Sequence, residues 1–119
     1  MKALLVLALI FISLSCYSQD IIWQDSTHYD FGDLKLNNSA THDFIFLNNS
    51  KQNIFVETVR TTCTCTDTEW TGSAVLPGKQ GKVRAIFNSH DLGYFNKKLK
   101  VYFKDIKGAI ILRVEGNVE

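Results

Sequence analysis

Two cysteines separated by a single residue, Cys63 and Cys65, have the side chains best suited to chemistry in this sequence. A thiolate is a nucleophile and a soft metal ligand, and two thiols can be oxidised to a disulfide. In an extended strand, residues i and i+2 point to the same face, with Cα atoms about 6.6 Å apart. That distance is near the upper limit for a disulfide, so a bond between these residues requires a bulge or a kink. The spacing leaves four interpretations open: a structural disulfide or buried thiols, a labile redox pair, part of a metal site, or a catalytic nucleophile.

A metal site at Cys63 and Cys65 would need further ligands from elsewhere in the chain. Two thiolates on one face suit Cu(I) or half of a zinc site. The remaining candidate ligands are His28, His42 and His90, and their spacing places none of them beside the pair. We therefore predict that the protein has no cofactor, with Cu or Zn bound at Cys63 and Cys65 as the alternative.

The sequence contains no pattern typical of an enzyme active site. The run Asp25-Ser26-Thr27-His28 has the residue types of a hydrolase triad, but triads are assembled from distant segments of a chain. Nucleophile elbows, phosphate-binding glycine loops and metalloprotease helices are also absent from the sequence. We predict that the protein has no catalytic residues.

The composition is that of one globular domain. The chain has 119 residues, of which 45% are hydrophobic and 21% charged, and its formal net charge is +1. Such a balance gives no electrostatic footprint for nucleic acid. The one basic run, Lys97-Lys98-Leu99-Lys100, alternates in the manner of a strand with lysines outward and its flanking aromatic residues inward. We therefore predict no nucleic-acid partner.

Residues 1–18 have the layout of a secretory signal peptide. Lys2 supplies the positive start, and residues 3–14 form an apolar run that is too short to cross a bilayer comfortably. Cleavage after Ser18 would leave residues 19–119 as the mature domain, with no transmembrane segment. Lipidation of Cys16 is the alternative, but Ser13 stands where a lipoprotein signal usually has an aliphatic residue. We predict plain export, to the periplasm or beyond.

The mature segment has an apolar period of two, which predicts strands rather than helices. Turn residues separate the segments, and Pro77-Gly78 fits the centre of a type II turn. The predicted strands lie at 21–23, 29–31, 41–47, 54–59, 83–87, 99–103 and 109–118. About seven strands with frequent turns predict an all-β, immunoglobulin-like sandwich. Gly93 is assigned to a loop, and Trp70 to a loop-like stretch in which an exposed indole could bind a partner.

Several of these segments occur in an order typical of a known family. The matching segments are Tyr29-Asp30-Phe31-Gly32, the run 41–49, Cys63-Thr64-Cys65 within 59–66, the run 76–83, and Gly93-Tyr94-Phe95-Asn96-Lys97. Together they resemble the bacterial domain of unknown function family 1573, over about Trp23 to Glu119. The resemblance implies an exported immunoglobulin-like sandwich, akin to domains of major sperm protein, pilus chaperones and ciliary scaffold proteins. It implies no known activity, and this chain has Thr64 where the family usually has glycine.

The first functional hypothesis is an exported, non-enzymatic binding or scaffolding module with an unidentified protein partner in the cell envelope. Such sandwiches commonly bind through loops at one end or through an open sheet edge. An uncovered edge strand or an apolar patch beside Trp70 would favour this hypothesis. The alternative is a metal-binding or thiol-redox protein that uses Cys63 and Cys65.

Overall fold

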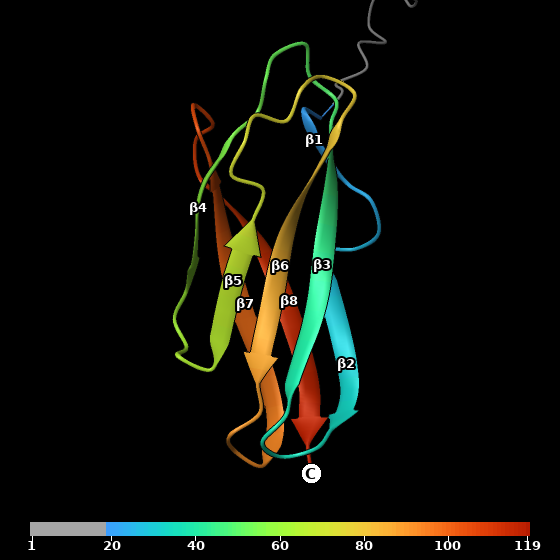
Figure 1. Cartoon of the computed structure of the whole chain (residues 1–119), viewed down its shortest axis with the longest axis vertical. Helices are drawn as coiled ribbons and strands as arrows, with labels where there is room; N and C mark the ends of the chain where they lie inside the picture. The colour runs from blue at the N-terminus through green and yellow to red at the C-terminus, as the bar shows by residue number, and fades with distance from the viewer. Residues whose placement is uncertain (1–18) are drawn as a thin grey trace, which may run out of the picture.

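The computed structural model describes residues 19–119, which form two β-sheets packed face to face (Figure 1). One sheet has the strand order β1-β3-β6-β5 and the other has the order β2-β8-β7-β4. The strands are β1 (Ile21–Trp23), β2 (His28–Leu34), β3 (Ser39–Asn48), β4 (Val56–Thr61), β5 (Thr66–Trp70), β6 (Gln80–Asn88), β7 (Gly93–Phe103) and β8 (Ala109–Val118). The all-β sandwich prediction is confirmed, with eight strands in place of about seven. The predicted signal peptide and Cys16 lie outside the described residues.

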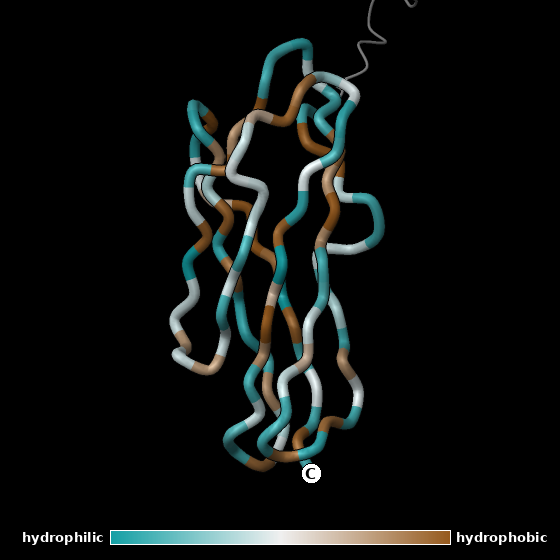
Figure 2. The backbone as a smooth tube through the Cα atoms, in the orientation of Figure 1, coloured by the Kyte–Doolittle hydropathy of each residue, from teal (hydrophilic) through white to brown (hydrophobic). Residues whose placement is uncertain are grey.

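Alternation of apolar and polar side chains positions the core between the two sheets. On β3, Phe44 and Phe46 are buried, and on β8, Leu112 and Val114 are buried, while Ile111 faces outward. Figure 2 shows this alternation as repeated changes between hydrophobic and hydrophilic colour along the strands. A period of two places successive residues on opposite faces, so each strand contributes one row of side chains to the core.

The core depends on one close approach that the sequence did not reveal. The ring of Phe46 packs edge-on against Phe103, with ring centroids 5.3 Å apart. Phe46 also lies directly over Gly81 of β6, and a Cβ atom at position 81 would clash with the ring. Gly81 is therefore required for space rather than for a special backbone conformation.

The chain changes sheets near its start. β1 pairs with β3 in the first sheet, and β2 then pairs in parallel with β8 in the second sheet. The other strand pairs, β3 with β6, β5 with β6, β4 with β7 and β7 with β8, are antiparallel. Two sheets with these orders are the arrangement of immunoglobulin-like sandwiches, with β2 added at the edge of the second sheet.

The turn predictions are largely confirmed. The backbone N–H of Lys79 donates to the carbonyl of Leu76 at 2.9 Å, and Gly78 has a φ of 78°. These are the hydrogen bond and the left-handed residue of a type II turn centred on Pro77-Gly78. The assignment of Gly93 to a loop is wrong, because this residue begins β7.

The strand that sequence reasoning missed is β5. Its sequence, TDTEW, contains four polar residues and one apolar residue, so it has no clear apolar alternation. It forms because residues 66–70 pair with 83–87 of β6, and the placement of Trp70 in a loop is therefore wrong. An edge strand needs fewer buried side chains than a central one, which explains the weak signal. Among residues 19–119, no helix is long and apolar enough to cross a membrane.

Candidate functional site

Cys63 and Cys65 lie in the turn that joins β4 to β5, at the left of Figure 1, and a disulfide links their Sγ atoms. The prediction that both belong to one face of an extended strand is wrong. Their Cα atoms are 5.2 Å apart, because the chain bends here as it passes from one sheet to the other. The bend supplies the kink that a bond between residues i and i+2 requires.

Hydrogen bonds close the disulfide turn tightly. The carbonyl of Cys63 accepts from the backbone N–H of Thr66 at 3.3 Å and from the hydroxyl of Thr61 at 3.2 Å. The N–H of Cys65 points to the Sγ atom of Cys63 at 3.2 Å. Thr64 is not among the residues with positive φ, so the turn accepts threonine where the related family usually has glycine.

A pocket of about 290 Å³ lies beside the disulfide, between the β4–β5 turn and the β6–β7 loop. It is lined by both cysteines and by His90, Leu92 and Tyr94. His90 is thus brought near the cysteines by the fold, which no local spacing in the sequence indicated. Within residues 19–119, no cluster of three or more His, Cys, Asp or Glu residues could hold a metal ion. While the two sulfurs are bonded to each other, neither is available as a thiolate ligand.

The edge of β5 presents backbone groups that have no partner strand. The N–H of Asn88 donates to the carbonyl of Cys65 at 2.8 Å, and the N–H of Thr71 donates to Lys82 at 3.1 Å. In an antiparallel pair, hydrogen-bonded residues alternate, so residues 65, 67, 69 and 71 face β6. The backbone groups of Thr66, Thr68 and Trp70 therefore point away from the sheet.

The three outward-facing residues of β5 differ in their hydrogen bonding. Thr66 is engaged by the disulfide turn, because its N–H donates to Cys63 and its carbonyl lies 3.4 Å from the Thr61 hydroxyl. For Thr68 and Trp70, the structure of residues 19–119 contains no comparable bond. The Trp70 indole is half-buried against the core, so this end of β5 offers backbone rather than an exposed aromatic ring. No sequence signal distinguished Thr68.

Side chains on the outer face attach β5 to its sheet. Glu69 lies 3.4 Å from a guanidinium nitrogen of Arg84 on β6, and the Nε atom of Arg84 is 2.7 Å from Asp43 on β3. The hydrogen bond from Arg84 holds the pKa of Asp43 below its ordinary value. The Asp67 carboxylate accepts from the Asn88 side chain at 3.1 Å. The acidic side chains of β5 are therefore bonded to residues of β6.

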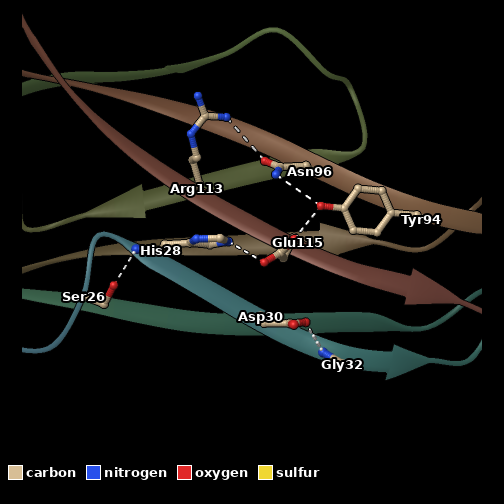
Figure 3. Close-up of polar contacts among 8 residues, drawn as sticks. All are labelled: Ser26, His28, Asp30, Gly32, Tyr94, Asn96, Arg113 and Glu115. Carbon is tan, nitrogen blue, oxygen red and sulfur yellow. Dashed lines mark hydrogen bonds and ion pairs between the residues drawn. The ribbon is translucent and has the colours of Figure 1, made fainter.

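β2, an edge strand of the other sheet, has two backbone N–H groups that are bonded by nearby side chains (Figure 3). Ser26 Oγ accepts from the N–H of His28 at 3.1 Å, and Asp30 Oδ1 accepts from the N–H of Gly32 at 2.7 Å. Gly32 has a φ of 71°, and the pairing with β8 shifts register here. A sequence signal for this cap exists, because aspartate commonly bonds the backbone two residues ahead.

A polar network covers the neighbouring outer surface of β7 and β8. Glu115 on β8 lies 2.7 Å from His28 Nε2 and also accepts a hydrogen bond from the Tyr94 hydroxyl (Figure 3). The bond to Glu115 raises the pKa of Tyr94. Tyr94 is 67% exposed, and Tyr102 lies on the outer face between the buried Val101 and Phe103, so the prediction that the aromatic residues flanking the lysine run all point inward is wrong for both tyrosines. Phe95 and Phe103 are buried as predicted.

The residues of the serine–histidine–aspartate run are not assembled as a triad. Ser26 Oγ contacts the backbone N–H of His28, whereas the His28 ring faces Glu115. The predicted histidine candidates also lie apart. His42 stacks on Tyr29 with ring centroids 3.7 Å apart, and burial lowers its pKa. Of the three, His90 is the one that shares a pocket with the cysteines.

The fold and the site together define an immunoglobulin-like, PapD-like sandwich in which the edge strand β5 has unpaired backbone groups. The chain is similar to a PapD-like domain of human CEP192, at 9% identity and a TM-score of 0.70, covering 90% of this chain and 96% of that one. It is also similar to a protein of unknown function from Porphyromonas gingivalis W83, at 14% identity and a TM-score of 0.68, covering 90% of this chain and 50% of that one.

The chain belongs to the protein family of unknown function DUF1573, whose model matches residues 21–118. A search of curated proteins gives no match. The secreted serine protease VesC from Vibrio cholerae contains a similar region, at 17% identity and a TM-score of 0.56, covering 75% of this chain and 21% of that one. The chain thus spans half the length of the Porphyromonas protein and about a fifth of VesC. These likenesses concern the fold alone.

Proposed function

We propose that this protein is an exported, non-enzymatic binding or scaffolding module that docks a protein partner of the cell envelope at the edge of β5. One observation carries the proposal: the outward backbone groups of Thr68 and Trp70 are unpaired, whereas two N–H groups of the β2 edge are bonded by side chains. An extended partner segment could add to such an edge as a further strand, with main-chain hydrogen bonds providing affinity.

The surroundings of β5 support docking of a partner rather than uncontrolled self-pairing. The strand has five residues, and the side chains on its solvent-facing side, Asp67 and Glu69, are negatively charged. Short, charged edges resist aggregation with copies of the same chain, because like charges would be brought together. The hydrogen bonds around Cys63 hold the start of β5 in place. Binding would therefore have a lower entropic cost, because this part of the edge is already ordered.

Export is the part of the proposal that rests on residues 1–18. Their charge, apolar run and small residues are those of a signal peptide. Mass spectrometry of the protein recovered from fractionated cells tests it. A mature chain that begins at Gln19 in the periplasmic or culture fraction is expected. A lipid-modified N-terminal Cys16 would replace simple export by membrane anchoring, and full-length cytoplasmic protein would contradict export.

A proline at position 68 tests the docking edge. The N–H of Thr68 points away from β6, so Thr68→Pro removes an outward donor without breaking the ladder. Residues 19–119 contain every described strand and the shared core, and serve as immobilised bait for envelope extracts. Thr68→Val, which keeps the N–H, is the matched control.

We expect partners captured by the unmodified domain to be retained by Thr68→Val and lost by Thr68→Pro. Circular dichroism and urea unfolding verify that both variants remain folded. Equal capture by the folded proline variant would exclude the β5 edge as the docking site and would favour the loops at one end of the sandwich instead.

Thiol chemistry at Cys63 and Cys65 is a second candidate, favoured by the pocket that the disulfide shares with His90. Reduction would produce two thiols on one turn, a pair suited to thiol–disulfide exchange or to Cu(I) or Zn. Anaerobic titration of the reduced domain with Cu(I), beside Cys63→Ser/Cys65→Ser, tests the metal function. Stoichiometric binding that is lost in the variant would support it, and equal weak binding would exclude it.

A further inference from the structure

The outer face of the β2-β8-β7-β4 sheet places like charges directly opposite each other. Arg60 of β4 is paired with Lys100 of β7, and Lys98 of β7 is paired with Arg113 of β8. Leu99 and Val101, which alternate with Lys98 and Lys100 along β7, are fully buried, so the two lysines point outward. Like charges on directly opposed strand residues destabilise a sheet. Two such pairs in neighbouring rows therefore lower the stability of this sheet, and the packing of the core does not require them.

These four cations are not neutralised by carboxylates. Among residues 19–119, ion pairs are formed by His28 and Arg84, and none by the four cations of this face. Arg113 donates instead to the neutral side-chain oxygen of Asn96 at 3.4 Å. The acid in the next row, Glu115, is already bonded by His28 and Tyr94. On the other sheet, by contrast, Arg84 is held between two carboxylates.

Three of these cations, Arg60, Lys98 and Lys100, line a groove of about 440 Å³, called the basic groove below. Among the residues that line it, Asn96 and Tyr102 supply neutral contacts and none is acidic. The Arg60 guanidinium lies over the Tyr102 ring, 5.5 Å from its centroid, which orients the charge along the groove. The groove is lined by Arg60, Asn96, Lys97, Lys98, Lys100 and Tyr102, together with two threonines.

We propose that the basic groove binds an extended acidic segment of a partner protein, with carboxylates at alternate positions. Lys98 and Lys100 are alternate residues of one strand and are therefore about 6.8 Å apart along it. An extended peptide presents every second side chain at the same spacing. Its carboxylates would relieve both like-charge pairs, so binding would be favoured by the repulsion that folding leaves in place.

The charges around the groove favour a short acidic peptide over a long polyanion. The cationic rows end at the row that contains Glu115, whose carboxylate would repel further negative charge. The overall charge of the chain is also close to neutral, so no wider field would hold a nucleic acid or an anionic membrane. This site is on the sheet face and is independent of the proposed docking edge at β5.

Fluorescence anisotropy with a labelled peptide in which glutamate alternates with threonine tests the proposal. We expect the domain of residues 19–119 to bind it, and salt to weaken the binding by screening. A peptide with the same glutamates in one block should bind more weakly, and one with glutamine for glutamate should not bind. Phosphatidylglycerol vesicles and a single-stranded oligonucleotide are the competing probes.

Paired charge-removal variants locate the binding. Lys98→Gln/Lys100→Gln is expected to weaken binding by about tenfold, as removal of two exposed ion pairs should. Lys35→Gln/Lys107→Gln removes the same charge from loops and should leave the affinity unchanged. The groove variant should also unfold at the same or a higher temperature, because it loses repulsion. Should it be unstable, Lys98→Arg/Lys100→Arg, which keeps the charge, is expected to retain binding.

Three results would overturn the proposal. The first is absence of peptide binding at low salt. The second is equal affinity in the groove and loop variants, which would leave a nonspecific charge effect. The third is tighter binding to the vesicles or to the oligonucleotide than to the alternating peptide, which would assign the groove to another class of ligand. Loss of partner capture by Thr68→Pro bears on none of these outcomes.

Discussion

The edge strands β2 and β5 differ in how their exposed backbone groups are hydrogen-bonded. An edge strand exposes N–H and C=O groups that can pair with another chain. At β2, the outward N–H groups of His28 and Gly32 are bonded by Ser26 and Asp30. At β5, the disulfide turn satisfies Thr66 alone, and Thr68 is left open.

This difference shows that side chains near in sequence can bond the exposed backbone groups of an edge strand without a further strand or loop. Both caps at β2 come from the residue two positions earlier in the chain. The sequence of β5 contains threonine and acidic residues that could in principle act similarly, yet Asp67 and Glu69 bond across the sheet instead. The unpaired part of the β5 edge therefore follows from where Asp67 and Glu69 form their bonds, and not from a lack of side chains that could bond the backbone.

The largest expected effect is the difference in stability between a proline at a β5 residue whose N–H faces β6 and a proline at one whose N–H faces away from the sheet. Asp67→Pro removes an N–H that faces β6 and should destabilise the domain by about 3 kcal/mol or more. Thr68→Pro removes an outward N–H and should change stability by less than about 1 kcal/mol. Urea unfolding monitored by tryptophan fluorescence measures both. Similar losses for the two prolines would show that the assignment of inward and outward residues along β5 is incorrect.

Removal of the disulfide should loosen β5 while leaving β2 unaffected. The bond closes a loop of about three residues, so Cys63→Ala/Cys65→Ala is expected to cost about 1.6 kcal/mol from chain entropy. Hydrogen exchange should become faster at the Thr66 amide, which donates to Cys63, and remain unchanged at Gly32. Uniformly faster exchange would mean that the turn stabilises the whole sandwich rather than one edge.

A smaller effect is expected from opening the β2 edge. Asp30→Ala deletes the acceptor for the Gly32 N–H and should cost about 1 kcal/mol, the net contribution of such a bond. Asp33→Ala removes an equally exposed acid of the same strand and is the control. Chemical denaturation gives the stability, and size-exclusion chromatography shows whether the uncapped edge pairs with another copy. A monomeric Asp30→Ala variant of unchanged stability would contradict the capping role.

The strands with regular alternation could be predicted from sequence, and the edge features could not. The rows Phe44 and Phe46 on β3 and Leu112 and Val114 on β8 are visible as period-two patterns because a buried face demands them. β5 lacked that pattern, since an edge strand buries little. Its existence depends on pairing with β6, which is a tertiary contact.

The geometry of the cysteine site was equally hidden from the sequence. The motif at 63–65 fixed the residue types but suggested a strand, whereas the chain turns there to change sheets. His90 reaches the same pocket from a loop some 25 residues later in the chain. Spacing along the chain carries no information about such a neighbour. The opposed cations of β4, β7 and β8 likewise emerge from strand register alone.

The smallest effect concerns the ion pairs of Arg84, which link β6 to the neighbouring strand β3 and to the edge strand β5. Arg84 contacts Asp43 and Glu69, and its hydrogen bond lowers the pKa of Asp43 in the folded state. A lowered pKa stabilises the fold above the ordinary aspartate value of 3.8, and this contribution is lost as the pH falls through the lower, folded value.

Arg84→Gln should therefore reduce stability by less than about 1 kcal/mol at neutral pH, because both side chains of the pair are partly exposed and solvent screens their charges. The deficit should vanish in acid, below the folded pKa of Asp43. Urea unfolding of the variant and the parent across this acidic range measures it, with Lys107→Gln in the β7–β8 loop as a charge control. A deficit that persists in acid would mean that Arg84 stabilises the sheet by packing rather than by its charge.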